Sequence, residues 1–510
     1  MKSCKNRVNA VVNGFKCIYQ LQKDDKLYYL LTKCNLFHII IKWYLDCTDI
    51  NAPRLCEKER NKMKGKNCYD LSPAQGVPYL QCKYTLFKRV INIMTSITFE
   101  EDVDFALMER AFNIVVERND CLRIRFFKQK GKLKQYFKDE VPYQKIPVVE
   151  YDTEKFNAFV KRYKKRAIKY LRGKVIEPHF IRLNGKCMIY FKVCHLVLDV
   201  YGTSVIYKDL IEVYNALKNN TELPPSPAKY EDVIKRDIER NYNDSRQKKH
   251  EEFFKDLLSE KAEPYYTGIH GPDNKIWQKK LKSNHRGMKM FFINNDTKAY
   301  IHTIGSDVSE RVINYCRENQ ISPANFFFYT CTLTAAILNN KTKISLPLSL
   351  CNCRITPNEK SCAGTKVQSV ACYTRYRYKK TFDENLKRFA SNQAKVYRHI
   401  DFPDIKFESM LHKAFRSSFL ETYYSIAFSF VPSNFPEGVE FTMYSNGKGA
   451  LPGYLIMLFD TKTNNIRLGY DVHTKTTSEA KVAKFHSMYI KVLNQVLDNP
   501  QIILDNITIE

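Results

Sequence analysis

A tight hairpin that runs straight into a helix is the feature of this chain that most limits its fold. The segment HFIRLNGKCMIYFKV (179–193) predicts two apolar strands around an Asn-Gly pair, which is typical of two-residue hairpin turns. Apolar residues then recur at helical spacing over 205–217. The same change of period occurs earlier, where 99–119 predicts a helix and 121–127 a strand. We therefore expect an α/β protein with an α+β sandwich.

The connection between that strand and helix carries two polar residues for which a buried strand has little use. In CHLVLDVYGTS, His195 and Asp199 stand four positions apart among apolar residues. We expect the chain to turn at Gly202, with Thr203 or Ser204 capping the helix. Reactive groups are commonly presented in such connections. An imidazole is the simplest general base near neutral pH, whereas a buried carboxylate needs a cationic partner.

The chain has 510 residues, which is too long for one ordinary core and enough for two lobes of typical domain size. No apolar run is long enough to cross a bilayer, and the first residues lack the apolar core of a signal peptide. These observations predict a cytoplasmic protein without a membrane span. The stretch KERNKMKGKN (58–67) reads as a solvated linker, so residues 1–67 are expected to form an N-terminal extension of unknown role.

A net charge of +28, from 82 Lys and Arg against 54 Asp and Glu, favours polyanionic partners. We interpret the densest basic stretch, KRYKKRAIKYLRGK (161–174), as a solvated face first and as a surface for an acidic protein second. Nucleic acid is the third possible partner, and no signature of a nucleic-acid-binding motif supports it. The 16 cysteines are scattered, and the close pair Cys351 and Cys353 has no second ligand pair nearby. We therefore expect reduced thiols and no metal site.

Residues 69–508 resemble the condensation domain of nonribosomal peptide synthetases, a member of the chloramphenicol-acetyltransferase-like acyltransferase superfamily. The segment CHLVLDV (194–200) is similar to the family's His-His-x-x-x-Asp-Gly block. Further blocks match in the family's order and spacing. They are YDLSPAQ (69–75), ERNDCLRIRF (117–126), YEDVI (230–234), EEFFKDLL (251–258) and YRHIDFPDIKF (397–407).

The resemblance implies two chloramphenicol-acetyltransferase-like lobes that form a V with a central tunnel. We place the N-terminal lobe at 68–260, an inter-lobe linker at 261–280 and the C-terminal lobe at 281–510. Donor and acceptor thioesters, each on the phosphopantetheine arm of a carrier protein, would enter the tunnel from opposite faces. No bound cofactor is implied, because the substrates themselves are carried on phosphopantetheine or CoA.

The same resemblance assigns the catalytic role to His195, which would deprotonate or position the acceptor amine. Asp199 matches the block's aspartate, which the family uses structurally by pairing it with an arginine of the other lobe. Arg354, at the end of SLPLSLCNCR, is the matching position, so we predict an Asp199–Arg354 salt bridge. Three further residues are candidates for lining the tunnel: Gly364, Gln368 and His399.

The chain departs from the family pattern at three places. Cys194 replaces the block's first histidine and is interpreted as a packing residue, because a catalytic thiolate needs a nearby cation and partial exposure. Val200 replaces the block's glycine, with Gly202 two residues later. Since a β-branched residue does not easily adopt φ > 0, we expect the turn to be built differently here. The stretch 361–375 only loosely resembles the family's Gly-x-Phe-Val-Asn-Thr block.

Three functions stay open. The first is a stand-alone condensation enzyme of nonribosomal peptide biosynthesis, which forms an amide between a carrier-bound acyl or aminoacyl thioester and an amine. The second is an acyltransferase that uses acyl-CoA and acylates a hydroxyl or an amine. The third is a condensation-like domain that recruits partners without catalysis, which the changes at positions 194 and 200 favour. For the first, we expect a monomer that meets acidic carrier proteins or synthetase modules in trans by electrostatic steering.

Overall fold

The chain divides into two units, Met1–Cys56 and Glu57–Glu510, and all the described residues belong to the second. The predicted extension 1–67 lies outside the described residues except for its last residue, and the predicted linker 261–280 is described only at 262–272. The lobe boundaries stay a prediction. The computed structural model describes residues 67–85, 87–259, 262–272, 285–288, 295–418, 421–449 and 451–509.

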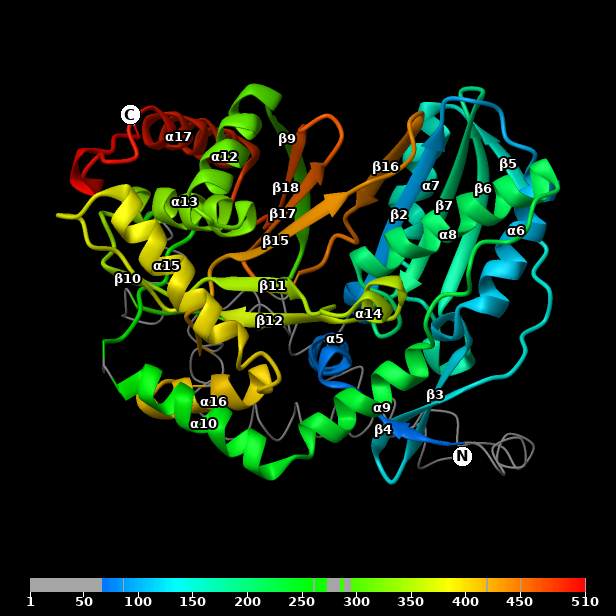
Figure 1. Cartoon of the computed structure of the whole chain (residues 1–510), viewed down its shortest axis with the longest axis horizontal. Helices are drawn as coiled ribbons and strands as arrows, with labels where there is room; N and C mark the ends of the chain where they lie inside the picture. The colour runs from blue at the N-terminus through cyan, green and yellow to red at the C-terminus, as the bar shows by residue number, and fades with distance from the viewer. Residues whose placement is uncertain are drawn as a thin grey trace, which may run out of the picture. The chain divides into compact units, whose positions relative to one another are not determined.

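One large sheet of the second unit has five strands in the order β16-β2-β7-β6-β5 (Figure 1). The predicted hairpin is confirmed, because β6 and β7 flank Asn184 and Gly185 with φ angles of 49° and 83°, as a two-residue hairpin turn requires. All neighbours are antiparallel except β5 and β6. The strands are β2 (Asn92–Phe99), β5 (Val148–Tyr151), β6 (Ile176–Leu183), β7 (Lys186–Cys194) and β16 (Val439–Tyr444).

Helices cover both faces of this sheet, because its strands place apolar side chains on alternate sides. On one face, α6 (Phe105–Arg118) and α8 (Val200–Asn219) pack against Ile189 and Phe191 of β7. On the other face, α7 (Thr153–Tyr163) packs against Met188 and Tyr190 of the same strand. The helix predicted at 99–119 is present as the shorter α6, because Phe99 ends β2 and Asp104 caps the helix.

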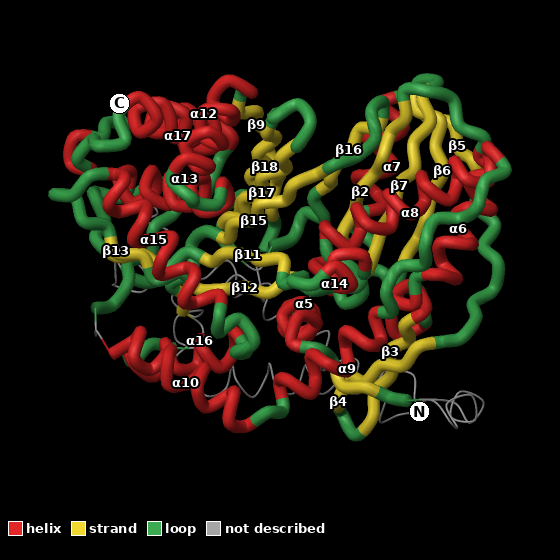
Figure 2. Tube along the Cα trace, viewed as in Figure 1, coloured by secondary structure: helices red, strands yellow, loops and turns green. Residues whose placement is uncertain are grey.

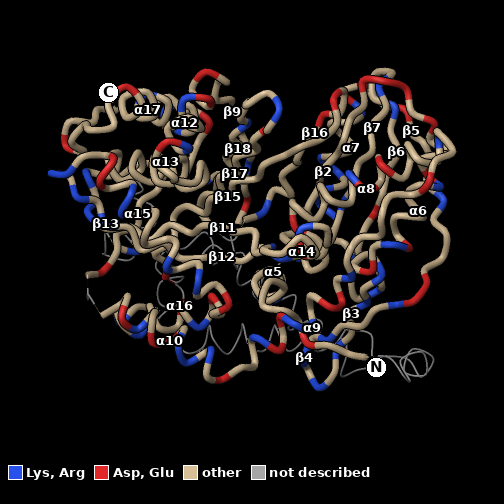
Figure 3. The backbone as a smooth tube through the Cα atoms, in the orientation of Figure 1, with Lys and Arg blue, Asp and Glu red and all other residues tan. Residues whose placement is uncertain are grey.

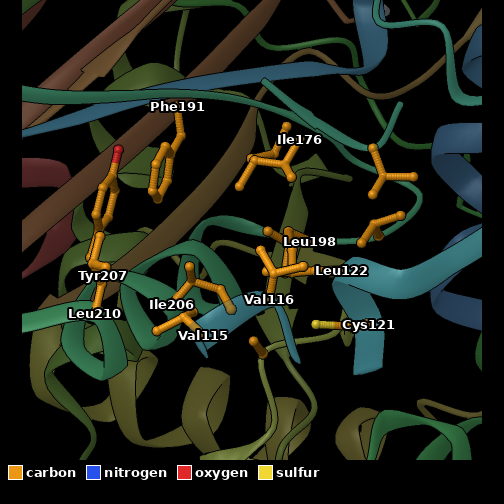
Figure 4. Close-up of a cluster of buried hydrophobic side chains, with 14 of the residues drawn as sticks. Val115, Val116, Cys121, Leu122, Ile176, Phe191, Leu198, Ile206, Tyr207 and Leu210 are labelled. Carbon is orange, nitrogen blue, oxygen red and sulfur yellow. The ribbon is translucent and has the colours of Figure 1, made fainter. Parts of the chain in front are cut away.

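The core between β7, α6 and α8 also encloses the connection that follows β7. Figure 4 shows Leu198 among side chains of this core, close to Val116 and Leu122. Leu196, Val197 and Leu198 are all fully buried. The apolar residues of the HLVLD segment thus belong to the core and hold the turn that carries the two polar residues.

A second large sheet has six strands in the order β12-β11-β15-β17-β18-β9. The central strand β15 pairs in parallel with β11 and β17, and the other pairs are antiparallel. Four helices share its main apolar core: α12 (Ser306–Glu318), α13 (Pro323–Leu338), α15 (Phe382–Tyr397) and α17 (Glu479–Asp498). The strands are β9 (Thr297–Ile304), β11 (Leu348–Asn352), β12 (Val367–Ala371), β15 (Ala427–Ser433), β17 (Gly453–Asp460) and β18 (Ile466–His473).

The apolar stretch 323–339 forms α13, and the amphipathic stretch 481–500 lies mostly in α17. The apolar stretch 343–354 does not form one continuous strand. It is divided into β10 (Ile344–Ser345) and β11, with Pro347 between them. Proline has no amide to donate to a strand ladder, which explains the break.

The segment 445–453 crosses between the two sheets. The strand before it, β16, pairs with β2 of the five-stranded sheet, and the strand after it, β17, lies in the six-stranded sheet. The Asn446 side chain donates to the carbonyls of Val90 (3.2 Å) and Asn92 (3.0 Å). The two sheets are therefore connected by paired backbone as well as by side chains.

Smaller elements complete the described unit (Figure 2). A three-stranded sheet has the order β1-β4-β3. Among the described residues, no single helix is both long enough and apolar enough to cross a membrane. The bent pair of α12 and α13 meets those two criteria only jointly, which is weak evidence. The remaining main elements are β1 (Tyr69–Asp70), α5 (Pro73–Tyr84), β3 (Ile124–Gln129), β4 (Lys132–Phe137), α9 (Tyr230–Asn241), α10 (Asp244–Ser259), α14 (Pro357–Ser361) and α16 (Asp404–Ala414).

Candidate functional site

The turn between β7 and α8 is held by its own backbone. The His195 amide donates to the Ile91 carbonyl at 2.9 Å, at the end of the pairing between β7 and β2. The amides of Val197 and Leu198 donate to the Cys194 carbonyl at 2.8 and 3.1 Å. The turn is therefore tight, and the position of His195 follows from the strand that precedes it.

His195 is half-buried. Its Nδ1 is buried and has no hydrogen-bond partner among the described residues. Nε2 is not among the buried atoms that lack a partner. Burial lowers the pKa of His195, and the charge of Asp199 and nearby backbone groups oppose this shift only in part. The ring is therefore neutral at neutral pH, as a proton acceptor must be.

The helix after the turn begins earlier than predicted. We expected Thr203 or Ser204 as the cap after a turn at Gly202, but α8 begins at Val200 with Asp199 as its N-cap. The Asp199 carboxylate accepts the Gly202 amide at 2.6 Å. An aspartate satisfies a free amide of the first helical turn as well as a hydroxyl does, so the helix extends back to it.

The structure contains the predicted ion pair between Asp199 and Arg354. Arg354 Nη1 lies 3.0 Å from Asp199 Oδ2, and Nη2 lies 3.1 Å from Oδ1. Asp199 Oδ2 also accepts the amides of Lys366 (2.7 Å) and Val367 (3.0 Å). Asp199 is 1% exposed and Arg354 5% exposed, so the pair is fully desolvated. Each carboxylate oxygen is occupied by these donors and the Gly202 amide, and none of the donors is His195.

These contacts determine the ionisation of the pair. Burial alone would raise the pKa of Asp199, but the charge and hydrogen bonds of Arg354 and the backbone amides hold it below its ordinary value. Burial would lower the pKa of Arg354, but Asp199 raises it above its ordinary value. Both groups are therefore charged at neutral pH, and each compensates the burial of the other.

Arg354 reaches Asp199 from the end of β11 and is held along its whole length. Its Nε donates to the Cys362 carbonyl at 3.1 Å, and Nη1 also donates to Asn352 Oδ1 at 2.8 Å. The guanidinium lies over the Tyr201 ring, 4.7 Å from its centroid. The arginine thus joins the end of the six-stranded sheet to the start of α8.

Gly202 is required by a close approach. Its φ is not positive, but a Cβ at this position would lie 1.7 Å from the Ala363 carbonyl oxygen. Val200 is the first residue of α8, is half-buried and has no positive φ, so the helix accommodates it without strain. The expectation that the turn differs from the family pattern stays a prediction.

Cys194 is the last residue of β7 and is fully buried. Burial raises the pKa of its thiol well above the ordinary value. A buried thiol of this kind is a packing group rather than a nucleophile.

The three candidate tunnel-lining residues lie at separate places. Gly364 is buried, and a Cβ there would lie 2.1 Å from the Tyr230 ring. Gln368 is half-buried on β12 opposite Cys351. His399 stacks on Phe253 of α10 with ring centroids 3.9 Å apart and contacts His250 Nδ1 at 2.9 Å. Their role in lining a tunnel stays a prediction.

Sequence reasoning missed residues that hold the turn from a distance. Helix α5 begins after Ser72, whose amide donates to Gln75 Oε1 at 2.8 Å. Gln75 Nε2 also donates to the Leu196 carbonyl at 2.8 Å, which places it beside the turn. Tyr230 donates to the Thr365 carbonyl at 2.7 Å. The block resemblances at 69–75 and 230–234 were the available signal for both residues.

No group of three His, Cys, Asp or Glu side chains within the described ranges is arranged to hold a metal ion.

Comparison with known proteins places this geometry in a family. A family model described as the condensation domain matches residues 66–509. The chain belongs to the condensation domain family. No curated protein sequence matches the chain.

Solved condensation domains share the fold. A variant of the starter condensation domain of rhizomide synthetase, in complex with C8-CoA, is 14% identical with a TM-score of 0.74 over 89% of this chain and 100% of that one. The first condensation domain of the calcium-dependent antibiotic synthetase, with a substrate analogue, is 12% identical with a TM-score of 0.71, over 87% and 99%. The condensation domain of Monacolin K polyketide synthase is 14% identical with a TM-score of 0.70, over 86% and 99%.

The predicted family and fold class are therefore confirmed. The mixed sheets described above are those of the chloramphenicol-acetyltransferase-like condensation fold. Condensation domains are in general acyl- and amide-forming transferases that work with carrier-bound substrates in nonribosomal peptide synthesis. The assignment of the turn with His195 and Asp199 to the family's active-site block stays a prediction.

Proposed function

We propose that this condensation domain transfers an acyl or aminoacyl group from a phosphopantetheinyl thioester on a carrier protein to an amine, forming an amide. One observation carries the proposal: the ring of His195 is half-buried and neutral at neutral pH, and the Asp199 carboxylate four residues later is occupied by Arg354 and backbone amides. The proposal includes stand-alone action in the cytoplasm with carrier proteins in trans.

In this reaction the amine nitrogen attacks the thioester carbonyl carbon. The new C–N bond forms as the C–S bond breaks, and the amine proton passes through His195 Nε2 to the departing thiolate. A neutral imidazole accepts that proton directly. Asp199 takes no proton, because Arg354 and three backbone amides occupy its oxygens. Asp199 instead fixes the start of α8 and with it the turn.

No covalent acyl-enzyme is part of the proposal. The thiol nearest to His195 in the sequence is that of Cys194, which is buried and protonated because burial raises its pKa. A protonated, inaccessible thiol is a poor nucleophile. We therefore place both bond changes in one transfer between the two bound substrates.

Transfer from acyl-CoA is the second candidate function, because the related starter condensation domain was solved with C8-CoA. The two candidates differ in the group that carries the thioester, and the second also includes a hydroxyl as acceptor.

The test uses the full chain with one acyl group on three donors: a carrier protein, CoA and N-acetylcysteamine. An amine and an alcohol acceptor are offered in parallel, and products are measured by mass spectrometry. We expect an amide, with kcat/KM highest for the carrier-bound donor. A higher kcat/KM for CoA favours the second function. Absence of product from every donor, with retained binding of the carrier protein, contradicts catalysis and favours a recruitment domain.

A further inference from the structure

A second network of buried charges lies beside the Asp199–Arg354 pair. Lys366 Nζ is 2.9 and 2.8 Å from the two carboxylate oxygens of Asp237 and 3.7 Å from Glu359 Oε1. Arg236 Nη2 contacts the same Glu359 oxygen at 2.6 Å. Lys366 is 4% exposed and Glu359 2% exposed. Lys366, Asp237 and Glu359 thus compensate one another where water is nearly excluded, while the Arg236 side chain is 37% exposed at the edge of the network.

Lys366 connects this network to the candidate site through its own backbone. Its amide donates to Asp199 Oδ2 at 2.7 Å, while its ammonium group reaches Asp237 on α9. The following amide, of Val367, donates to the same Asp199 oxygen at 3.0 Å. A displacement of Lys366 therefore moves two of the donors that hold Asp199, four residues after His195.

Glu359 fixes the other end of the same segment. Its Oε2 accepts the amides of Ile355 (2.8 Å) and Thr356 (3.0 Å), directly after Arg354. These amides, Lys366 and Arg236 keep the pKa of Glu359 below its ordinary value, although burial acts in the opposite direction. We call residues 354–367 the strap. The strap is held near both ends by the network, and it supplies every donor to Asp199 described above except the Gly202 amide.

The middle of the strap contacts the turn itself. The Thr365 amide donates to the Val197 carbonyl at 2.8 Å, and Leu198 forms a backbone bridge with Gly364. The strap therefore lies against the residues between His195 and Asp199. Because hydrogen bonds join the two segments, a shift of the strap would also move these residues.

We propose that Lys366 is a positioning residue: through its ion pair with Asp237 it sets the place of the strap and of Asp199, and so the orientation of the His195 ring. The inference rests on the proposed function, since it takes His195 as the reactive group. Lys366 itself touches no substrate in this account.

The test compares variants of Lys366 in the full chain. Removing the ammonium group alone leaves Asp237 buried without its partner and endangers folding. The double variant Lys366→Met with Asp237→Leu removes both charges, which buried pairs tolerate far better, and leaves Glu359 paired with Arg236. Lys366→Arg keeps the charge. Lys448→Met is the matched control, because Lys448 is also buried (2% side-chain exposure) and pairs with Asp296 at 2.7 Å on another segment.

The main measurement is the titration of His195 by NMR in protein with ¹³C-labelled histidine. The His195 signal is identified by its loss in His195→Gln, and no substrate is present. We expect the double variant to fold and to shift the titration midpoint of His195 by about half a pH unit or more. Its kcat should fall about tenfold with little change in KM, because the ring is displaced and the substrates still bind. Lys366→Arg and Lys448→Met should keep the wild-type midpoint.

An unchanged midpoint in the folded double variant overturns the proposal. An equal shift in Lys448→Met also overturns it, because the effect is then general loosening of the fold. The titration needs no activity, so a wild-type chain without turnover contradicts the proposed function, while the link from Lys366 to His195 is decided by the midpoint alone.

Discussion

At the scale of single residues, the candidate site gives its two polar groups separate tasks. The HxxxD spacing suggests that the carboxylate of Asp199 orients the imidazole of His195. Instead, Asp199 binds Arg354 and three amides, and His195 Nδ1 has no partner among the residues that the structure describes. The carboxylate holds the backbone of the turn, and the backbone holds the ring. Substitution of Asp199 should therefore lower the stability of the fold, whereas substitution of His195 should lower the rate of catalysis.

Asp199→Ala is expected to lower the free energy of unfolding by about 3–5 kcal/mol, because it leaves the Arg354 charge buried and unpaired. Urea denaturation measures this loss. The control is Asp505→Ala, which breaks the exposed pair with Lys341 and should cost about 1 kcal/mol or less. Equal losses in the two variants contradict the role given to Asp199.

The ion pair also predicts a pH dependence of stability. The pKa of Asp199 is lower in the folded chain than in the unfolded chain, so the folded state holds its proton less tightly. Its contribution is therefore complete above the unfolded pKa of about 4 and is lost as pH falls through the lower folded value. We expect thermal unfolding midpoints of Asp199→Asn to depend less on pH below about pH 4 than those of the wild type. Parallel curves for the two proteins contradict this assignment.

At the scale of elements, the first turn of α8 determines the geometry of the candidate site. Its first turn passes so close to the strap that only glycine fits at position 202. Asp199 is the N-cap of this turn, and the same carboxylate forms the ion pair with Arg354, which follows β11. The N-terminal end of α8 therefore connects the five-stranded sheet to the six-stranded sheet.

Gly202→Ala is expected to prevent folding or to lower the free energy of unfolding severely, because the added carbon meets the Ala363 carbonyl at 1.7 Å. Gly76→Ala, inside α5, is the matched control. A Cβ there meets nothing within 4 Å, so helix propensity should stabilise the chain by about 0.5–1 kcal/mol. Circular dichroism and thermal unfolding measure both. A stable, fully folded Gly202→Ala would contradict the close approach.

Elements with strong local signals were predictable from the sequence, and long-range contacts were not. The Asn-Gly hairpin and α13 follow from turn chemistry and apolar periodicity. The predicted start of α8 was wrong because Asp199, Thr203 and Ser204 are all residue types that cap helices well. Which of them caps the helix depends on where the Asp199 carboxylate lies, and only the folded chain determines that position.

Parts of the site were predictable only through the family blocks. His195, Asp199 and Arg354 followed from the resemblance, and their ion pair is present. Lys366 gave no signal of its own, because its amide binds Asp199 across 167 positions of sequence. Gln75 likewise reaches the Leu196 carbonyl across 121 positions. No periodicity or local propensity encodes such contacts.

At the scale of the whole molecule, positive charge is spread over many elements. Figure 3 shows Lys and Arg on strands, helices and loops of the described unit. With a net charge of +28, long-range attraction should speed encounters with an acidic carrier protein. Such steering is screened by salt, because the Debye length shortens to about 3 Å at 1 M ionic strength.

We therefore expect kcat/KM for the carrier-bound donor to fall about tenfold or more between low and high salt, through slower association. The neutral N-acetylcysteamine thioester is the control, and its kcat/KM should change little. Steady-state kinetics over a series of NaCl concentrations measures both donors. The same salt dependence for the two donors would contradict electrostatic steering by the carrier protein.

The central claim is tested most directly by single-turnover amide formation with wild type, His195→Ala and Cys194→Ala. His195→Ala should slow product formation by about 10²–10⁴-fold with an unchanged unfolding midpoint, because general base catalysis is lost and the fold is not. Cys194→Ala should keep turnover close to that of the wild type. A folded His195→Ala variant that forms the amide at the wild-type rate would contradict the account.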